Sequence, residues 1–409
     1  MRSGRRRAAI LIIYVILTLL AIQGCSGKHA AENGTLVDAA KNITKTGENK
    51  TKQQAVNEQL SENDSSKEIK NIETKNVDKP ISTDADKFIS TKEELRPVLL
   101  ENLQQGKDTV FTASEELIKQ GLDKISINIA ETAGFGGYIS NVEYSKQKNK
   151  VSLHFNYRGG KDNFLKKFPQ VEAKVKKVVA SVVKSGMTEF QKELALHDYV
   201  VNNTKYDYEK LKSNSVLDDD FTAYGVLINK TAVCEGYAEA MYRLLSAAGI
   251  ENKIAIGTGA GTPHAWNIVK IDGKYYHLDT TFDDPISNSG DVLSYNYFNI
   301  TDSQMAKDHT WTKSDYPACT STAANYYIKK GLYAKSSEEY YNIVRSGLEK
   351  KLSVIRCKIS SDDTEVYKKD IVYEVVKSNE AFNYVDMSDG YSFSYDPNNR
   401  IYEFYVKYK

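Results

Sequence analysis

Three short motifs in the middle of the 409-residue chain supply a thiol, an imidazole and a carboxylate, in that order. They read VCEGYA over 233–238, HAWN over 264–267 and HLDTT over 277–281. Cys234 begins a segment with apolar residues at helical spacing, which ends at Gly249. A cysteine on the first turn of a helix faces unpaired backbone N–H groups and the positive end of the helix dipole. Both favour the thiolate, the form that attacks carbonyl carbon. Cys234 is therefore a candidate nucleophile.

The imidazole and the carboxylate can be placed by the register of a predicted hairpin. Asp272-Gly273 is the dipeptide most typical of a two-residue turn between antiparallel strands. If it sets the register, Trp266 lies opposite Asp279, and His264 projects on the same face. His264 and Asp279 then become diagonal neighbours, roughly 7 Å apart at the backbone. A carboxylate that holds one ring nitrogen fixes the tautomer and leaves the other nitrogen free to take a thiol proton.

The run from about Thr188 to Pro285 resembles the bacterial transglutaminase-like domain of the papain-like cysteine-enzyme superfamily. The matching segments are YDY (206–208), AYGVL (223–227), VCEGYA (233–238), AGI (248–250), HAWN (264–267) and DTTFDDP (279–285). The resemblance implies Cys234 as the nucleophile, His264 as the base and Asp279 as the acid that orients the base. It also implies an α+β core in which helices, the Cys234 helix among them, pack on an antiparallel sheet that carries His264 and Asp279. The implied chemistry is acyl transfer through a thioester on peptide or protein amides, by hydrolysis, amide exchange or crosslinking, and it requires no cofactor.

Each of these residues also has an ordinary explanation. A free cysteine usually fills a core, a lone histidine such as His264 is more often a core or edge residue, and Asp279 alone could be a turn carboxylate. Their order and register together favour a catalytic site, with a catalytically inactive cell-surface binding or scaffold protein as the alternative. The backbone N–H of Cys234 is the first expected donor to an oxyanion. Tyr224 and Trp266 are candidates for a second donor or a supporting position, and packing is the alternative for Tyr224.

The beginning of the chain predicts export. A basic stretch over 2–7 precedes an apolar run from Ala8 to Ile22, and the letters QGC follow, ending at Cys25. This order is typical of a secretory signal. It resembles the bacterial lipoprotein type, in which Cys25 is acylated after cleavage and anchors the protein by lipid at the extracytoplasmic face of the cell membrane. A retained membrane helix is one alternative, although such a helix needs about 20 apolar residues. Secretion without an anchor is another.

Residues 26–88 are expected to form a disordered tether. From Ser26 to Lys87 there is no aromatic residue, and Lys, Asn, Glu, Thr and Ser dominate. Such a segment cannot bury enough apolar surface to offset the entropy of ordering it. The expected partners are the membrane, through the lipid, and a peptide or protein substrate, for which the cell wall is one source. The formal net charge of +1 gives no electrostatic case for nucleic acid.

The cysteine count fits an exported protein with a reactive thiol. If Cys25 belongs to the signal, an odd number of cysteines remains, which indicates a free thiol in such a protein. These are Cys234, Cys319 and Cys357. Cys319 and Cys357 could pair, but their spacing does not require it. The spacing of His277, His309 and Cys319 is too diffuse for a metal-binding motif, so no metal site is expected.

Two segments on either side of these motifs show the same order of elements. In residues 89–160, the patterns indicate a helix (91–103), a strand (108–113), a second helix and a hairpin (139–157). In residues 311–409, they indicate a helix (337–350), a strand (352–359), a second helix (364–377) and a hairpin (391–408). We therefore predict a duplicated small α+β module on either side of a catalytic domain at 161–310. Convergence is the alternative, because such strings of elements are common.

Overall fold

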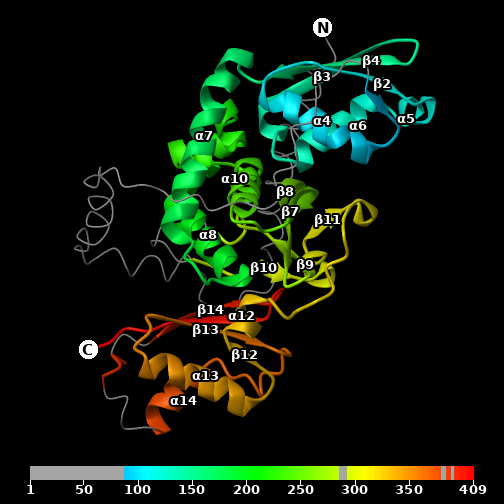
Figure 1. Ribbon diagram of the computed structural model, residues 1–409. Helices are drawn as coiled ribbons and strands as arrows, with labels where there is room; N and C mark the ends of the chain where they lie inside the picture. The colour runs from blue at the N-terminus through cyan, green and yellow to red at the C-terminus, as the bar shows by residue number, and fades with distance from the viewer. Residues whose placement is uncertain (1–86, 285–292, 379–383, 388–390) are drawn as a thin grey trace.

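The computed structural model describes residues 87–284, 293–378, 384–387 and 391–409. The protein is of the α+β class, with a central unit between two smaller units (Figure 1). The predicted signal with Cys25, and nearly all of the predicted tether, lie outside the described residues and stay predictions. Among the helices that the structure describes, none is both long enough and apolar enough to cross a bilayer.

The first unit is a four-stranded sheet that packs against helices. Its elements are β1 (Phe88–Ile89), α4 (Lys92–Gln104), β2 (Thr109–Ala113), α5 (Glu115–Lys119), α6 (Leu122–Thr132), η1 (Gly136–Tyr138), β3 (Ile139–Gln147) and β4 (Lys150–Tyr157). The strand order is β1-β2-β4-β3, with β1 parallel to β2 and the other pairs antiparallel. Along β4, Val151, Leu153 and Phe155 are buried, because alternate side chains of a strand share one face.

The central unit places a five-stranded antiparallel sheet behind three long helices (Figure 1). Its helical elements are α7 (Lys161–Val182), α8 (Glu189–Asn203), α9 (Tyr208–Lys212), η2 (Asp218–Phe221), η3 (Gly225–Asn229), α10 (Cys234–Ala247), α11 (Asp302–Met305) and η4 (Lys313–Asp315). Its strands are β5 (Lys205–Tyr206), β6 (Thr231–Ala232), β7 (Asn252–Gly259), β8 (Thr262–Ile271), β9 (Lys274–Leu278), β10 (Phe298–Ile300) and β11 (His309–Trp311). The sheet order is β10-β9-β8-β7-β11, and α10 packs across β7 and β8.

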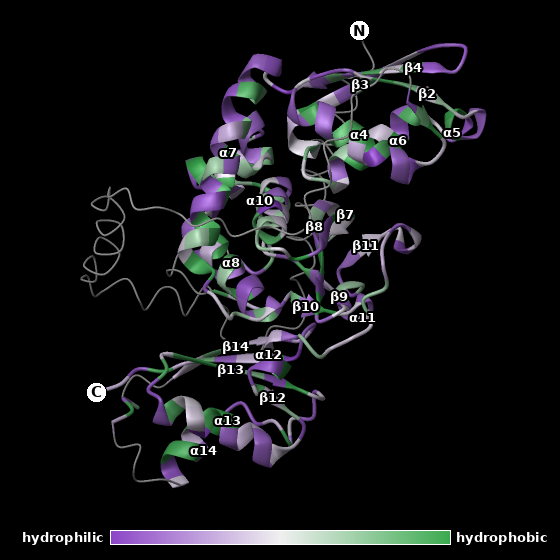
Figure 2. Ribbon diagram, in the orientation of Figure 1, coloured by the Kyte–Doolittle hydropathy of each residue, from purple (hydrophilic) through white to green (hydrophobic). Residues whose placement is uncertain are grey.

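Local sequence signals account for these helices. Thr188 and Gln191 form a capping box at the start of α8: the Thr188 side chain accepts the backbone N–H of Gln191, and the Gln191 side chain accepts that of Thr188. Helix α7 shows both hydrophobic and hydrophilic residues (Figure 2), and its buried face includes Val171 and Val175. That face joins α8, α10 and the inner sides of β8 and β9 in one core.

The last unit repeats the topology of the first. Its elements are α12 (Tyr326–Lys329), β12 (Tyr333–Ala334), α13 (Ser337–Glu349), β13 (Val354–Ile359), α14 (Ile371–Ser378), β14 (Ser392–Asp396) and β15 (Ile401–Tyr405). The strand order is β12-β13-β15-β14. As in the first sheet, the first pair (β12 and β13) is parallel and the other pairs are antiparallel. The two flanking units thus share one order and one pairing of strands, and the duplication itself stays a prediction. The sequence patterns missed β1 and β12, because two residues are too few to show alternation.

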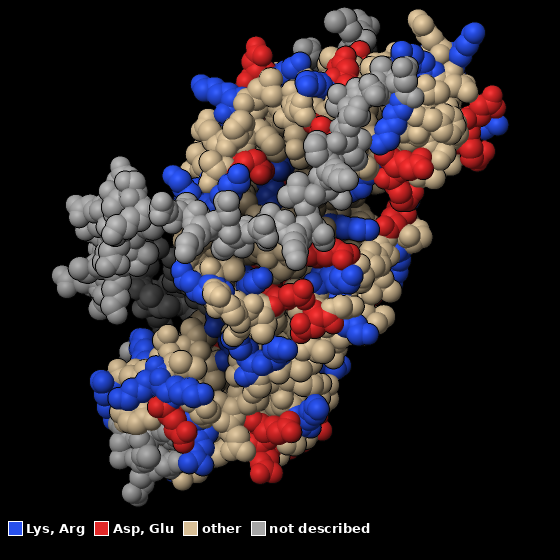
Figure 3. Space-filling view, in the orientation of Figure 1, with Lys and Arg blue, Asp and Glu red and all other residues tan. Residues whose placement is uncertain are grey.

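The visible surface mixes both signs of charge. Figure 3 shows Lys and Arg side chains interspersed with Asp and Glu over the face presented there. This distribution agrees with the nearly balanced formal charge of the whole chain.

Candidate active site

Cys234 is the first residue of α10 and is half-buried. The preceding residue, Val233, has extended backbone and donates its N–H to the carbonyl oxygen of Asp220 at 2.9 Å, which fixes where the helix begins. The glycine of the VCEGYA motif permits this arrangement, because a Cβ at Gly236 would lie 2.7 Å from the Asp220 carbonyl oxygen. The thiol therefore sits at the N-terminus of α10, beside unpaired backbone N–H groups and the positive end of the helix dipole.

The hairpin of β8 and β9 has the register predicted from the sequence. Asp272 and Gly273 both have positive φ angles, 49° and 75°, as a type I′ turn requires. The turn pairs Ile271 with Lys274. This register brings His264 on β8 next to Asp279, the residue after β9, and the His264 Nε2 lies 2.7 Å from the Asp279 Oδ2. The predicted imidazole–carboxylate contact is confirmed.

Asp279 is fully buried and is surrounded by donors. Its Oδ1 accepts the backbone N–H groups of Thr281 and Phe282, each at 3.1 Å. Its Oδ2 faces the Nε2 atoms of His264 at 2.7 Å and of His309 at 3.1 Å. Burial alone would raise the pKa of Asp279, but the two histidines outweigh burial and hold that pKa well below its usual range. Asp279 is therefore a carboxylate at neutral pH.

His264 joins the carboxylate to the thiol. Since Asp279 takes Nε2, the Nδ1 atom is left for Cys234, which lines the same cleft as His264. Burial works against a charged imidazolium, but Asp279 and Cys234 outweigh it and raise the pKa of His264 to about 10. The rings of Trp266 and Phe282 lie 5.9 Å and 4.9 Å from the imidazole, centroid to centroid, and limit its motion. His264 is therefore placed between the Asp279 carboxylate and the side of the cleft that Cys234 lines.

The two candidates for supporting roles lie in different places. The Tyr224 ring packs against the core of α7 and α10 with the Lys167 Nζ 5.1 Å from its centroid, and Tyr224 is not among the residues that line the cleft described below. Trp266 lies beside His264, but its indole N–H donates to the His277 Nδ1 at 2.9 Å. Neither side chain therefore offers a free donor to an oxyanion in this geometry. Packing accounts for Tyr224, and support of His264 accounts for Trp266.

Sequence reasoning missed a phenol near the nucleophile. Strand β5 pairs with β6 in parallel and sets Tyr206 beside Ala232, two residues before Cys234. Burial, and then the charge of Cys234, raise the pKa of Tyr206, so the phenol keeps its proton. The YDY motif that contains Tyr206 was the available signal, but the motif alone does not indicate which of its residues approaches the thiol.

The triad opens into a cleft of about 470 Å³ whose walls come from two units. Cys234, His264 and Pro263 line one side, and the first unit contributes Glu131 and Arg158 among others. Burial raises the pKa values of Glu131 and of Glu235, the latter to about 7. The first unit was predicted only as a flanking module, and its part in the cleft has no signal in the sequence.

A buried arginine holds the first unit against α10, the helix that begins with Cys234. Arg243 of α10 donates from Nη2 to the carbonyl oxygen of Gly134 at 2.5 Å. It also pairs with Glu239 at 2.6 Å and with Glu172 of α7 at 2.9 Å. The Phe135 ring lies below the same guanidinium, 5.0 Å from centroid to Cζ. The wall of the cleft is thus fixed to the helix that carries the nucleophile.

Two groups of side chains have potential metal-ligand atoms within 4.8 Å of one another. They are His264 with Asp279 and His309, and His277 with Asp302 and Cys319. The spacing of His277 and Cys319 in the sequence did not indicate that they meet, but β9 and the loop before α12 bring them together. Yet the His277 Nδ1 accepts from Trp266, so its Nε2 carries the proton donated to Asp302 at 2.8 Å. Both ring nitrogens of His277 are therefore already engaged in hydrogen bonds.

The remaining cysteines do not pair. Cys319 and Cys357 are buried free thiols in separate hydrophobic clusters. Burial raises the pKa of each thiol strongly. Both are therefore poor nucleophiles, in contrast to the accessible Cys234.

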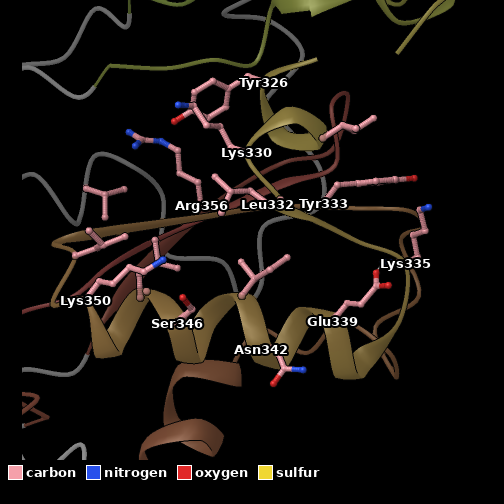
Figure 4. Close-up of a pocket in the computed structure, with 17 residues that line it drawn as sticks. Tyr326, Lys330, Leu332, Tyr333, Lys335, Glu339, Asn342, Ser346, Lys350 and Arg356 are labelled. Carbon is pink, nitrogen blue, oxygen red and sulfur yellow. Dashed lines mark hydrogen bonds between the residues drawn. The ribbon is translucent and has the colours of Figure 1, made fainter. Parts of the chain in front are cut away.

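A second cavity, of about 720 Å³, lies in the last unit. Figure 4 shows Glu339 and Ser346 on α13, Lys350 directly after that helix, and Arg356 on β13, around it. Arg356 is engaged by Glu403 at 2.7 Å. No histidine or cysteine is among the described residues that line this cavity, so it offers no nucleophilic chemistry of the kind found at Cys234.

Comparison with known proteins places the same motifs in a described superfamily. Residues 176–280 match the family model for the transglutaminase-like superfamily. Among solved structures, one called a TGase is 20% identical, with a TM-score of 0.27. The similar region covers 47% of this chain and 55% of that chain. A candidate cysteine protease from Cytophaga hutchinsonii is 15% identical (TM-score 0.23; 34% and 61% covered), and a candidate protease from Parabacteroides distasonis is 11% identical (TM-score 0.22; 42% and 39% covered). The chain thus spans less than two thirds of each of these proteins. No curated protein matches it.

Proposed function

Since residues 176–280 form a transglutaminase-like domain, we propose that the protein is a cysteine acyl-transfer enzyme acting on peptide or protein amides. The observation that carries the proposal is the contact of Asp279 with His264, together with the position of His264 and Cys234 in one cleft. Asp279 orients the imidazole, His264 exchanges protons, and Cys234 is the nucleophile.

The reaction follows from these positions. The Cys234 thiolate attacks the amide carbonyl carbon, and the backbone N–H of Cys234 donates to the oxygen that becomes negative. His264 gives its proton to the leaving amine, the C–N bond breaks and a thioester remains. Neutral His264 then takes a proton from water or from a second amine, which attacks the thioester and releases the thiolate. Water yields hydrolysis, and an amine yields transamidation or a crosslink.

We also propose that this reaction takes place outside the cytoplasm, at the membrane face to which an acylated Cys25 would anchor the chain. The order of basic, apolar and QGC segments before Cys25 supports this location. Peptides or proteins of the cell surface, including those of the cell wall, are then the accessible substrates.

Alkylation by iodoacetamide tests the nucleophile without knowledge of the substrate. Cys234 should react much faster than Cys319 and Cys357 near neutral pH, and these two buried thiols serve as controls within the same molecule. Equal, slow alkylation of all three cysteines would instead support the non-catalytic binding protein.

Activity is tested with a variant. Cys234→Ala should fold normally and lose all incorporation of a fluorescent amine into protein substrates, together with all peptide hydrolysis. Mass spectrometry of surface proteins from cells with and without this variant would identify the substrates. Turnover that survives in Cys234→Ala would remove the assignment of the nucleophile.

A further inference from the structure

A second histidine contacts the carboxylate of the proposed triad. His309 begins β11, which pairs with β7 and sets His309 beside Gly259. Its Nε2 lies 3.1 Å from the Asp279 Oδ2, the same oxygen that His264 contacts. Its Nδ1 lies 2.6 Å from the Asp308 Oδ1. The imidazole is 1% exposed, so water does not compete for either nitrogen.

These contacts fix the protonation state of His309. Ionised carboxylates only accept hydrogen bonds, and each ring nitrogen of His309 faces one. Both nitrogens must therefore carry protons, which makes His309 an imidazolium. Burial opposes this charge, but Asp279 and Asp308 outweigh burial and raise the pKa of His309.

We propose, on the basis of the proposed function, that His309 is a positioning residue of the catalytic site. Its Nε2–H holds the Asp279 carboxylate in the orientation that His264 requires. Its positive charge, with the two rings 5.3 Å apart between centroids, makes a second positive charge on His264 less favourable. His309 thus acts in two separable ways, through a hydrogen bond and through a charge.

Other charged and titratable groups around His309 are few. Asp279 and Asp308 contact it directly, His264 acts on it through its charge, and the charge of His309 in turn helps to lower the pKa of His277. The Tyr297 ring lies 5.6 Å away, and its hydroxyl donates to the other oxygen of Asp308 at 2.5 Å. A chain of contacts therefore runs from Tyr297 through Asp308, His309 and Asp279 to His264.

Two variants separate the hydrogen bond from the charge. His309→Gln keeps an N–H donor toward Asp279 but carries no charge, whereas His309→Leu keeps neither. Thr310→Val is the matched control, because Thr310 is the next residue of the same strand, is exposed, and projects to the opposite face. The rate at which iodoacetamide alkylates Cys234 is followed against pH by peptide mass spectrometry.

The wild-type rate should reach a plateau at mildly acidic pH, where the thiolate–imidazolium pair exists, and rise again where His264 loses its proton. On that plateau, His309→Leu should react about tenfold more slowly, the factor that one hydrogen bond to a charged group commonly represents. The alkylation rate of His309→Gln should stay within about threefold of the wild-type rate, because the glutamine amide keeps a hydrogen-bond donor toward Asp279. In both variants the upper rise should move to higher pH, because a neighbouring positive charge has been removed. Thr310→Val should match wild type throughout.

The outcomes separate this inference from the proposed function. A wild-type plateau that is unchanged in both His309 variants, with an unchanged upper rise, would overturn the role of His309 and leave the triad intact. Absence of the plateau in the wild type would remove the triad itself. NMR of ¹⁵N-labelled histidine gives an independent measurement should His309→Leu fail to fold. Both ring nitrogens of His309, assigned through their loss in His309→Gln, should be protonated at neutral pH, and a neutral ring would contradict the proposal.

Discussion

Gly259 lies so close to His264 that a methyl group on its α-carbon would come within 2.9 Å of the imidazole Cδ2. The same methyl group would come within 2.9 Å of the His309 Nε2. The absence of a side chain at this position on β7 therefore lets both imidazoles reach Asp279.

Gly259→Ala should displace His264 and slow alkylation of Cys234 about 10- to 100-fold, since misplacing a catalytic group by about 1 Å has effects of this size. Thr258→Val is the control, because it changes the neighbouring residue of the strand without adding bulk beside the imidazoles. Circular dichroism should show both variants folded. An alkylation rate equal to wild type in Gly259→Ala would show that the imidazole tolerates the displacement.

Asp279→Asn should keep the hairpin and lower the turnover rate about 10²- to 10⁴-fold, by analogy with serine triads in which the same change favours the wrong tautomer of the histidine. Asp302→Asn is the matched control, because Asp302 holds His277 on the same sheet but does not contact His264. Rates measured on any amide substrate check the prediction. A decrease below about fivefold would mean that Asp279 does not orient the base.

Glu193 gives a pH dependence of stability that is independent of the cleft. This buried side chain of α8 accepts a hydrogen bond from the Asn299 side chain at 2.7 Å, and burial raises its pKa to about 8. A carboxyl group whose pKa is higher in the folded state than in the unfolded state binds more protons when folded, so stability falls as pH rises between the two values. Relative to Glu193→Gln, the wild type should lose about 1–4 kcal/mol of unfolding free energy between about pH 4.5 and about pH 8. Urea unfolding across this range measures the difference, and a constant difference would show that Glu193 titrates normally.

The predicted lipid anchor is tested at Cys25. Cys25→Ser should block processing and leave a longer precursor, because acylation of this cysteine precedes cleavage in the lipoprotein type. Gentle proteolysis of the membrane-bound wild type should release a soluble fragment that begins near residues 82–92, where the predicted tether ends. Normal processing of Cys25→Ser, with the protein free in the medium, would identify an ordinary secreted protein instead.

The parts of the site that follow from nearby residues could be predicted from the sequence. The turn at Asp272-Gly273 sets the register of β8 and β9, and that register is enough to bring His264 to Asp279. Helical spacing after Cys234 likewise predicts the helix that presents the thiol. Each of these inferences uses residues within one hairpin or one helix, where periodicity fixes relative position.

The contacts that were missed join distant segments. His309 reaches Asp279 only because β11 adds to the far edge of β7, and no spacing in the sequence encodes that pairing. The meeting of His277 with Cys319 has the same origin. Glu131 enters the cleft through the packing of one unit on another, which depends on the shapes of both surfaces. Such long-range placement is invisible to local patterns.

The contacts of Arg243 show that the segment similar to the family is shorter than the part of the chain that packs together. The match begins at residue 176, after Glu172, Phe135 and Gly134, yet all three contact the Arg243 guanidinium. A polypeptide trimmed to residues 176–280 would keep Arg243 and its ion pair with Glu239 but would lose the Gly134 carbonyl, the Phe135 ring and Glu172. Expression boundaries drawn at sequence similarity would therefore yield an unstable fragment. The smallest independently stable form of the protein should begin near residue 87 and include the first unit.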